Sequence, residues 1–199
     1  MSEDNPPEET VKKPARKGPK IPRKITEKYL YNAGLAYLQR FPAARAHFIA
    51  VMRRRIDKSC RHHTDQDKEA CYALLEAAAD KFGELGYLND ELYLKGMVNS
   101  LRGRGLSATA IRMKLRQKGL KEDEIAHALA AHDEENGLSD RSAALRLCRR
   151  KRIGPYAASP DAAKDPATRQ KWLASLARAG FSYEDAVRAI DAGRDDVSD

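Results

Sequence analysis

Residues 107–132 read SATAIRMKLRQKGLKEDEIAHALAAH, and this stretch decides the fold. Ser107 is a residue type that caps helix starts by accepting a backbone N–H hydrogen bond. Ile111 and Leu115 follow at a spacing of four residues, which places both on one face of a helix. Gly119 then ends the apolar pattern, as a left-handed residue after a helix commonly does. The first part of the stretch therefore predicts a short amphipathic helix closed by a glycine.

The second part of the stretch predicts another helix in the same way. The acids at 122–124 suit the positive amino end of a helix dipole, and Ile125 and Leu129 again share one face. An earlier helix over about 90–102 is indicated by four apolar positions at helical spacing. They are Leu94, Met97, Val98 and Leu101. Three short helices therefore form one unit. Asp90 with Glu91, like Thr26 with Glu27, is expected at a helix start.

The same pattern recurs along the chain. A shift of 61 residues keeps every apolar position apolar and puts Gly119 on Gly180. The pairs are Ile111 with Trp172, Leu115 with Leu176, Leu120 with Phe181, Ile125 with Ala186 and Leu129 with Ile190. A shift of 63 in the other direction sets Phe48 and Met52 on Ile111 and Leu115. Units of this size are stabilised by stacking on their neighbours.

We therefore predict an all-α fold of three tandem three-helix, helix-turn-helix-like repeats in an elongated curved array. The predicted units are 26–88, with an insertion at 57–69, then 89–137 and 138–193. The insertion and a proline-bearing loop from Ile153 to Pro166 are expected to be mobile surface segments. Trp172, Phe181 and Tyr183 are assigned to the core of the last unit.

The ends and the composition bound the remaining possibilities. Residues 1–25 are rich in Pro, Lys and Glu and are predicted to be a disordered basic tail, and 194–199 a short acidic tail. No apolar run reaches the ~18 residues that a membrane span needs. Three cysteines without a regular framework fit a reducing compartment, so we expect a cytoplasmic protein.

Charge is segregated along the chain, whose formal net charge is +8. The range 95–121 holds eight Lys or Arg and no acid, and 141–152 holds six more and no acid. Between them, 122–140 holds seven acids and no Lys or Arg. Such blocks predict surface stripes that attract a polyanion, or a protein that coats one. Solvated helix faces without a partner are the alternative explanation.

The candidate contact residues are the cations of these blocks and a basic triplet in the first unit. Arg102 and Arg104, which flank Gly103, could present an anion contact in a glycine-rich turn. The full set is Arg53, Arg54, Arg55, Arg102, Arg104, Arg112, Lys114, Arg116, Lys118, Arg149, Arg150, Lys151 and Arg152. Capping of a helix end is a sufficient role for the last four, although four in succession exceed what a cap requires.

Three segments resemble the RecX family, in the family's order. They are LGYLNDE at 85–91, GLS at 105–107 with the apolar pattern that follows, and LARAGFSY at 176–183. The resemblance spans about 26–193, and the first unit departs from it most because of its insertion. It implies a helical protein that lies in the groove of the RecA filament and restrains ATP hydrolysis and strand exchange. A RecA filament and, weakly and without sequence preference, single- and double-stranded DNA are the expected partners of a monomer.

The other function classes have less support in the sequence. A non-specific, phosphate-contacting DNA-binding protein is the main alternative. Sequence-specific reading by the helices of 107–132 is disfavoured, because the second helix opens with acids and holds no Arg, Lys, Asn or Gln. Cys60, His62, His63 and Cys71 lack the spacing of a zinc site. No phosphate-binding loop, HExxH or nucleophile elbow occurs, so we expect neither an enzyme nor a cofactor.

Overall fold

The computed structural model describes residues 21–193, and in that range all regular structure is helical. The α-helices are α1 (Glu27–Leu38), α2 (Arg45–His62), α3 (Lys68–Glu84), α4 (Asp90–Gly103), α5 (Ala108–Arg116), α6 (Glu122–Glu135), α7 (Asp140–Lys151), α8 (Pro166–Arg178) and α9 (Tyr183–Ile190). Two 3₁₀ turns, η1 (Gly154–Tyr156) and η2 (Pro160–Lys164), join α7 to α8. The prediction of an all-α fold is confirmed.

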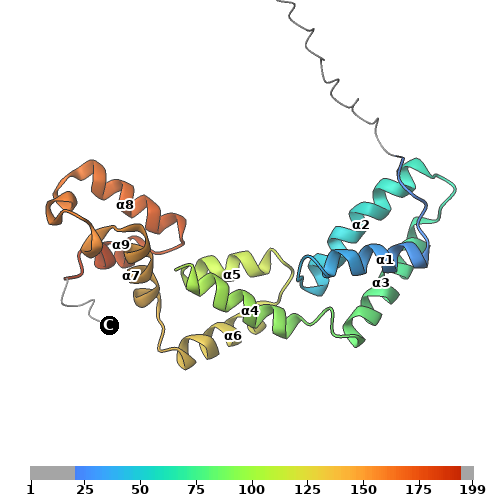
Figure 1. The fold of residues 1–199 in the computed structure, drawn as a ribbon, viewed down its shortest axis with the longest axis horizontal. Coiled ribbons are helices and arrows are strands. Elements are labelled where there is room, and N and C mark those ends of the chain that lie inside the picture. Colours follow the sequence, from blue (N-terminus) through green and yellow to red (C-terminus); the bar gives the residue numbers. More distant parts are fainter. Residues whose placement is uncertain (1–20, 194–199) are drawn as a thin grey trace, which may run out of the picture.

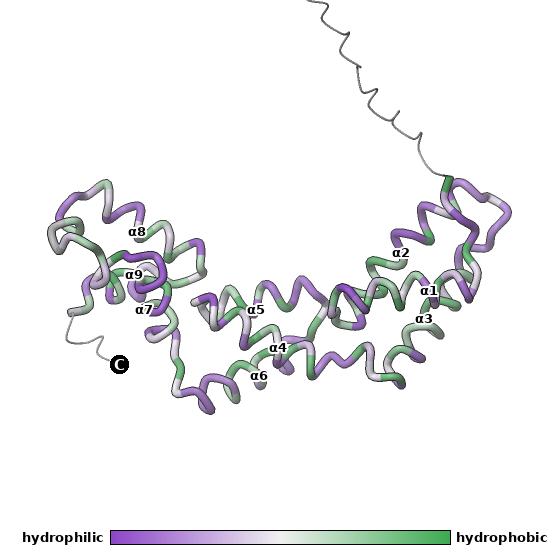
Figure 2. The backbone as a smooth tube through the Cα atoms, in the orientation of Figure 1, coloured by the Kyte–Doolittle hydropathy of each residue, from purple (hydrophilic) through white to green (hydrophobic). Residues whose placement is uncertain are grey.

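The helices follow one another along a crescent (Figure 1). Its inner edge carries α2, α5 and α8, while α6 lies at the outer edge. Apolar and polar residues alternate within the helices (Figure 2), as expected where each helix buries one face. We call α1–α3, α4–α6 and α7–α9 the first, second and third units, and the contacts between successive units the first and second joints.

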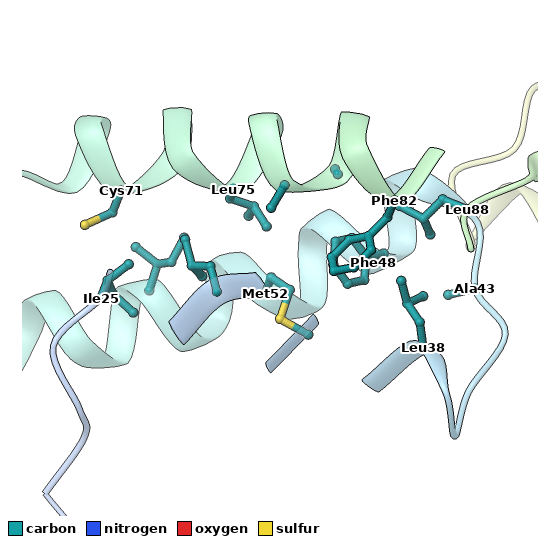
Figure 3. Packing of buried hydrophobic residues seen from close by; sticks show 13 residues of the cluster. Ile25, Leu38, Ala43, Phe48, Met52, Cys71, Leu75, Phe82 and Leu88 are labelled. Carbon is teal, nitrogen blue, oxygen red and sulfur yellow. The ribbon is translucent and has the colours of Figure 1, made fainter. Parts of the chain in front are cut away.

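The first unit packs around two phenylalanines that are fully buried. The rings of Phe48 on α2 and Phe82 on α3 meet edge to face with centroids 5.7 Å apart (Figure 3). Gly34 on α1 lets this pair approach, since a Cβ there would lie 2.7 Å from the Phe82 ring. The glycine therefore allows the three helices to close around an aromatic centre.

The second and third units have separate buried clusters. The second is built on α4, α5 and α6, with Val98, Ile111, Leu115 and Ile125 excluded from solvent. The third contains Leu147, Cys148 and Leu176 among its buried residues. Gly119 and Gly180 both have positive φ, of 83° and 88°, at equivalent positions after α5 and α8. The unit bounds 26–88, 89–137 and 138–193 stay a prediction, which this grouping supports.

The two joints use the same hydrogen bond. At the first, the Asp90 carboxylate, in the first residue of α4, accepts from the backbone N–H of Arg45, the first residue of α2 (2.7 Å). At the second, Asp140, the first residue of α7, accepts from the N–H of Ala108, the first residue of α5 (2.9 Å). Each unit therefore caps the second helix of the unit before it. Asn89, and not Asp90, caps α4 itself.

Each joint also brings a glycine against the same helix. A Cβ at Gly119 would lie 2.5 Å from the Cβ of Ala46 in the first turn of α2. A Cβ at Gly180 would lie 2.5 Å from the Cβ of Ala110 in α5. The glycine that ends the second helix of one unit thus touches the start of the second helix of the preceding unit.

The insertion predicted at 57–69 is not a mobile loop. Residues 57–62 continue α2, and α3 begins at Lys68. The helix continues because Ser59 extends the buried stripe of α2 and donates its hydroxyl to the carbonyl of Arg23 (2.7 Å). The Gln66 side chain then holds the backbone of Ile25. Its amide oxygen accepts from the Ile25 N–H and its amide nitrogen donates to the Ile25 carbonyl, each over 2.9 Å.

Three further expectations change in the structure. Residues 21–25 of the predicted tail are ordered against this turn, with Ile25 buried; residues 1–20 and the predicted acidic tail 194–199 lie outside the described residues. The loop after α7 is anchored, because Ile153 and Ala157 are buried. Tyr183 is 75% exposed and does not belong to the core, since it is the first residue of α9 and faces solvent.

Candidate functional site

A cationic groove crosses the second joint. It has a volume of about 510 Å³, an apolar floor that includes Leu101, Leu106 and Leu147, and no acidic residue in its lining. Its cations are Arg104, Lys114 and Lys118 from the second unit and Arg150, Lys151 and Arg178 from the third. Because like charges repel, such a lining favours occupation by an anion.

Helix α5 and the turn that follows it supply this groove from one of the two flanks of the helix. Lys114 and Lys118 line the groove, whereas Arg112 and Arg116 lie on the opposite flank beside Glu122. Their Nε atoms are 3.7 and 3.8 Å from the Glu122 carboxylate. Both arginines are exposed, so these pairs contribute little to stability and leave the guanidinium groups accessible.

The basic run after α7 is also divided. Arg150 and Lys151 line the groove, and the Lys151 ammonium donates to the hydroxyl of Ser175 on α8 (2.5 Å). Arg149 is exposed outside the groove lining, and Arg152 ends α7 in the left-handed conformation with φ of 54°. Half of the predicted cluster therefore belongs to the groove.

The triplet Arg53, Arg54 and Arg55 is exposed on α2 and is not part of the groove. Arg53 contacts Glu76 (3.2 Å) and lies 5.0 Å above the Tyr72 ring, so it packs within the first unit. Arg54 lies near His47. Burial first, and then the charges of Lys118 and Arg54, lower the pKa of His47 below its ordinary value. The cationic surface therefore continues across the first joint toward α2.

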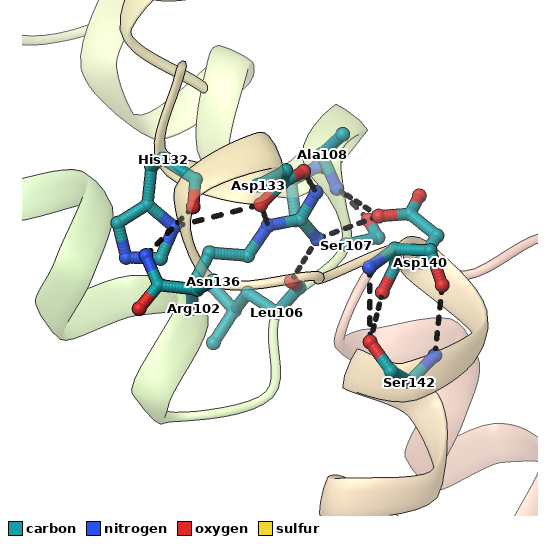
Figure 4. A network of polar contacts seen from close by, with 11 residues as sticks. Arg102, Leu106, Ser107, Ala108, His132, Asp133, Asn136, Asp140 and Ser142 are labelled. Carbon is teal, nitrogen blue, oxygen red and sulfur yellow. Dashed lines mark hydrogen bonds and ion pairs between the residues drawn. The ribbon is translucent and has the colours of Figure 1, made fainter. Parts of the chain in front are cut away.

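Arg102 was predicted as a surface contact, and this prediction is wrong. Its side chain is 2% exposed and forms a fork with Asp133, with Nε 3.0 Å from Oδ1 and Nη2 bonded to Oδ2 (Figure 4). Nη1 donates to Asp140 (2.6 Å) and to the carbonyl of Leu106 (3.1 Å). Burial opposes the charged guanidinium, but the hydrogen bonds with Asp133 and then Asp140 outweigh it and raise the pKa of Arg102. The glycine-flanked turn buries this arginine and leaves only Arg104 exposed.

One groove residue was missed from the sequence. Arg178 ends α8 and lines the third unit's side of the groove. A signal existed, because the shift of 61 residues pairs it with Gln117, which lines the same groove from α5. Equivalent positions of two units thus line the same groove.

No group of three or more His, Cys, Asp or Glu among residues 21–193 is placed to hold a metal ion. Cys60 lies on α2 and Cys71 is buried on α3, while His63 contacts the carbonyl of Pro22 (2.8 Å). Within the same range, no helix is both long enough and apolar enough to cross a membrane.

The fold and the groove define the class of protein: an elongated, all-helical chain of stacked three-helix units with a groove lined by cations at the second joint. Residues 89–129 match the family description "RecX, second three-helix domain". The chain is 39% identical over 180 residues to a protein named "Regulatory protein RecX" from Myxococcus xanthus (strain DK1622), covering 90% of this chain and 94% of that protein. The chain belongs to the RecX family.

Two further comparisons agree with this assignment. A "Regulatory protein RecX" from Thermobifida fusca (strain YX) is 31% identical over 157 residues, covering 78% of this chain and 74% of the relative. A solved structure titled "Crystal structure of regulatory protein RecX" superposes with a TM-score of 0.51 at 22% identity, covering 83% of this chain and 72% of the other. That structure supports the fold.

Proposed function

We propose that this chain is a non-enzymatic regulator that binds RecA–DNA filaments and restrains their ATP hydrolysis and strand exchange. Membership of a family of regulatory proteins supports the first part, and the resemblance in the sequence implies RecA as the partner. The single structural observation that carries the proposal is the acid-free cationic groove across the second joint, which is lined in part by α5 and α8, two helices of the inner edge of the crescent (Figure 1). A long anionic partner can contact such an edge at several points, each weak alone.

The distribution of acids supports an orientation of this partner. Helix α6 holds Glu122, Asp123 and Glu124 in its first turn and lies at the outer edge of the crescent. A cavity of about 680 Å³ between α4 and α6 is lined by four acids, Asp90, Glu91, Glu124 and Glu135, against one lysine, Lys95. An anionic filament would be attracted to the inner edge and repelled from the outer one.

A non-specific DNA-binding protein is the second candidate, and the groove also favours it. Six cations around an apolar floor suit contacts with phosphates, which position a protein on nucleic acid without reading its sequence. This candidate and the first differ in whether RecA is needed and in how steeply binding falls with salt.

The test is RecA ATP hydrolysis on single-stranded DNA, titrated with this chain, beside an assay of its binding to the same DNA without RecA. The groove variant is Lys114→Gln with Lys118→Gln. The matched control is Lys95→Gln with Lys121→Gln, which removes the same charge from two exposed lysines of the same unit that pair with Glu91 and Glu124.

Filament regulation predicts inhibition well below one chain per RecA, at a salt concentration where binding to bare DNA is weak. The groove variant should inhibit less, and the control should inhibit as the unaltered chain does. If inhibition occurs only where the chain coats bare DNA, the second candidate is correct. For that candidate, removing two phosphate contacts should reduce the salt slope on single strands by about 1.4.

A further inference from the structure

The cationic groove exists only while the second and third units keep their relative position. One wall is the end of α4 with α5, and the other is α7 with α8. Each wall contributes three of the six cations, and no single unit contains both walls. The spacing of the charges is therefore set by the second joint and not by the fold of either unit.

Arg102 is the side chain that ties this joint. Arg102 lies on α4, and its guanidinium pairs with Asp133 on α6, inside its own unit. Its remaining nitrogen reaches Asp140, which is the first residue of α7 and belongs to the next unit. Asp140 in turn accepts from the N–H of Ala108, so one carboxylate closes a ring through α4, α5 and α7 (Figure 4). The guanidinium is thus shared between the two units.

The first joint has no equivalent. Between the residues that the structure describes, no ion pair joins the first unit to the second. The first joint has the hydrogen bond from the Arg45 N–H to the Asp90 carboxylate. Beside it, the cations Lys118 and Arg54 lie near His47. The second joint has in addition a backbone hydrogen bond from the Ser107 N–H to the Ala179 carbonyl (3.1 Å). The ion cluster is therefore specific to the joint that carries the groove.

We propose that Arg102 is a positioning residue, which fixes the third unit on the second so that the two walls of the groove bind one anionic strand together. The inference rests on the proposed function in its use of the groove, while the fixing of the joint can be measured without it. Arg102 does not contact the anion itself, because its side chain is buried under the joint.

Only an arginine can make these contacts at once. Its planar fork donates to both oxygens of Asp133 and still has a nitrogen free for Asp140 and the Leu106 carbonyl. A lysine keeps the positive charge but has a single head without the fork geometry. Arg102→Lys is therefore the sharpest variant. Asp140→Asn is the second, because an amide oxygen can still cap Ala108 while the charge of the pair is lost.

The first measurement is amide hydrogen exchange by NMR on the full chain. The Ser107 and Ala108 amides are bonded across the second joint, whereas those of α5 beyond them are bonded within the helix. In Arg102→Lys we expect the two joint amides to exchange roughly tenfold faster or more, with the interior of α5 unchanged. A general loss of stability would instead accelerate all of them together.

The second measurement is binding of a single-stranded oligodeoxythymidine by fluorescence anisotropy at several salt concentrations. Six phosphate contacts give a slope of about −4 on single strands, and three contacts from one wall give about −2. We expect Arg102→Lys to lower both the affinity and the slope toward the second value. The matched control is Arg169→Lys, which breaks another arginine–aspartate fork, with Asp191 (2.6 and 2.7 Å), inside the third unit.

Two results would overturn the inference. One is unchanged exchange at Ser107 and Ala108 in both Arg102→Lys and Asp140→Asn. The other is faster exchange at the joint with the salt slope of binding unaltered. If the unaltered chain binds no oligonucleotide, the groove part of the proposed function fails, and the exchange rates alone decide whether Arg102 fixes the joint.

Discussion

The first joint can be tested by adding one methyl group. Gly119 has a φ of 83°, and a Cβ placed on it would lie 2.5 Å from the Cβ of Ala46. The next atoms of Ala46 are 3.7 and 3.9 Å away, so the conflict is between two methyl groups. Gly119→Ala should therefore destabilise the chain, and Ala46→Gly should relieve most of the damage.

The magnitude follows from two contributions. A left-handed alanine costs about 1–2 kcal/mol. Reduced freedom of the unfolded chain offsets about 0.4–1 kcal/mol, which leaves about 1 kcal/mol. Forcing a methyl group into a filled contact adds about 1–3 kcal/mol, so Gly119→Ala should cost about 2–4 kcal/mol in total. In a chain that already carries Ala46→Gly, only the backbone contribution of about 1 kcal/mol should remain.

The assay is urea unfolding of the four chains of this double-mutant cycle, followed by far-ultraviolet circular dichroism. Equal m values in all four chains are required for the comparison. Gly137→Ala is the control, because Gly137 also has positive φ but no atom within 4 Å of the added Cβ. It should cost about 1 kcal/mol, the backbone contribution alone. If Gly119→Ala costs the same with and without Ala46→Gly, the close approach of the two units is refuted.

Three further predictions concern other parts of the chain. Oligonucleotide bound beside Lys118 should favour the protonated form of the neighbouring His47, whose pKa lies below its ordinary value. Affinity should therefore increase as the pH falls below about 6.5, and His47→Gln should lose this increase. Burial raises the pKa of the Cys148 thiol to about 11, so at about pH 8 iodoacetamide should modify Cys60 in the folded chain and Cys148 only after unfolding, as mass spectrometry would show; equal rates would contradict the burial. Gln66→Ala removes both contacts to Ile25 and should cost about 1–3 kcal/mol in urea unfolding, with faster proteolysis at 21–25; unchanged cleavage would show that this segment is held elsewhere.

The fold could be predicted where its signals are local. Ser107 accepts from the N–H of Ala110 (3.1 Å), and Gly119 is left-handed, so both signals of the predicted helix hold. The extension of α2 could not be predicted, because Ser59 is a polar residue with no apolar signal. Its burial depends on acceptors elsewhere in the chain, chiefly the carbonyl of Arg23, 36 residues away, which accepts from its hydroxyl.

The same distinction separates the predicted from the unpredicted part of the groove. Lys114, Lys118, Arg150 and Lys151 could be identified because they lie in acid-free runs beside helices with a clear apolar face. Arg102 lies in such a run too, but its partners are 31 and 38 residues away, in the acidic block. Charge counted along the sequence cannot distinguish a cation that faces solvent from one that the next unit neutralises.

The backbone N–H at the start of the second helix is satisfied differently in the third unit than in the first two. Arg45 and Ala108 are the first residues of α2 and α5, and each backbone N–H donates to a carboxylate of the following unit. By the shift of 61 residues, Ala108 corresponds to Arg169. Because α8 begins one turn earlier, at Pro166, the Arg169 N–H already donates to the Asp165 carbonyl (3.0 Å). Asp165 caps the next turn by accepting from the Thr168 N–H (2.9 Å). At this position the third unit therefore leaves no free donor, whereas in the first two units the donor is satisfied by a carboxylate of the following unit.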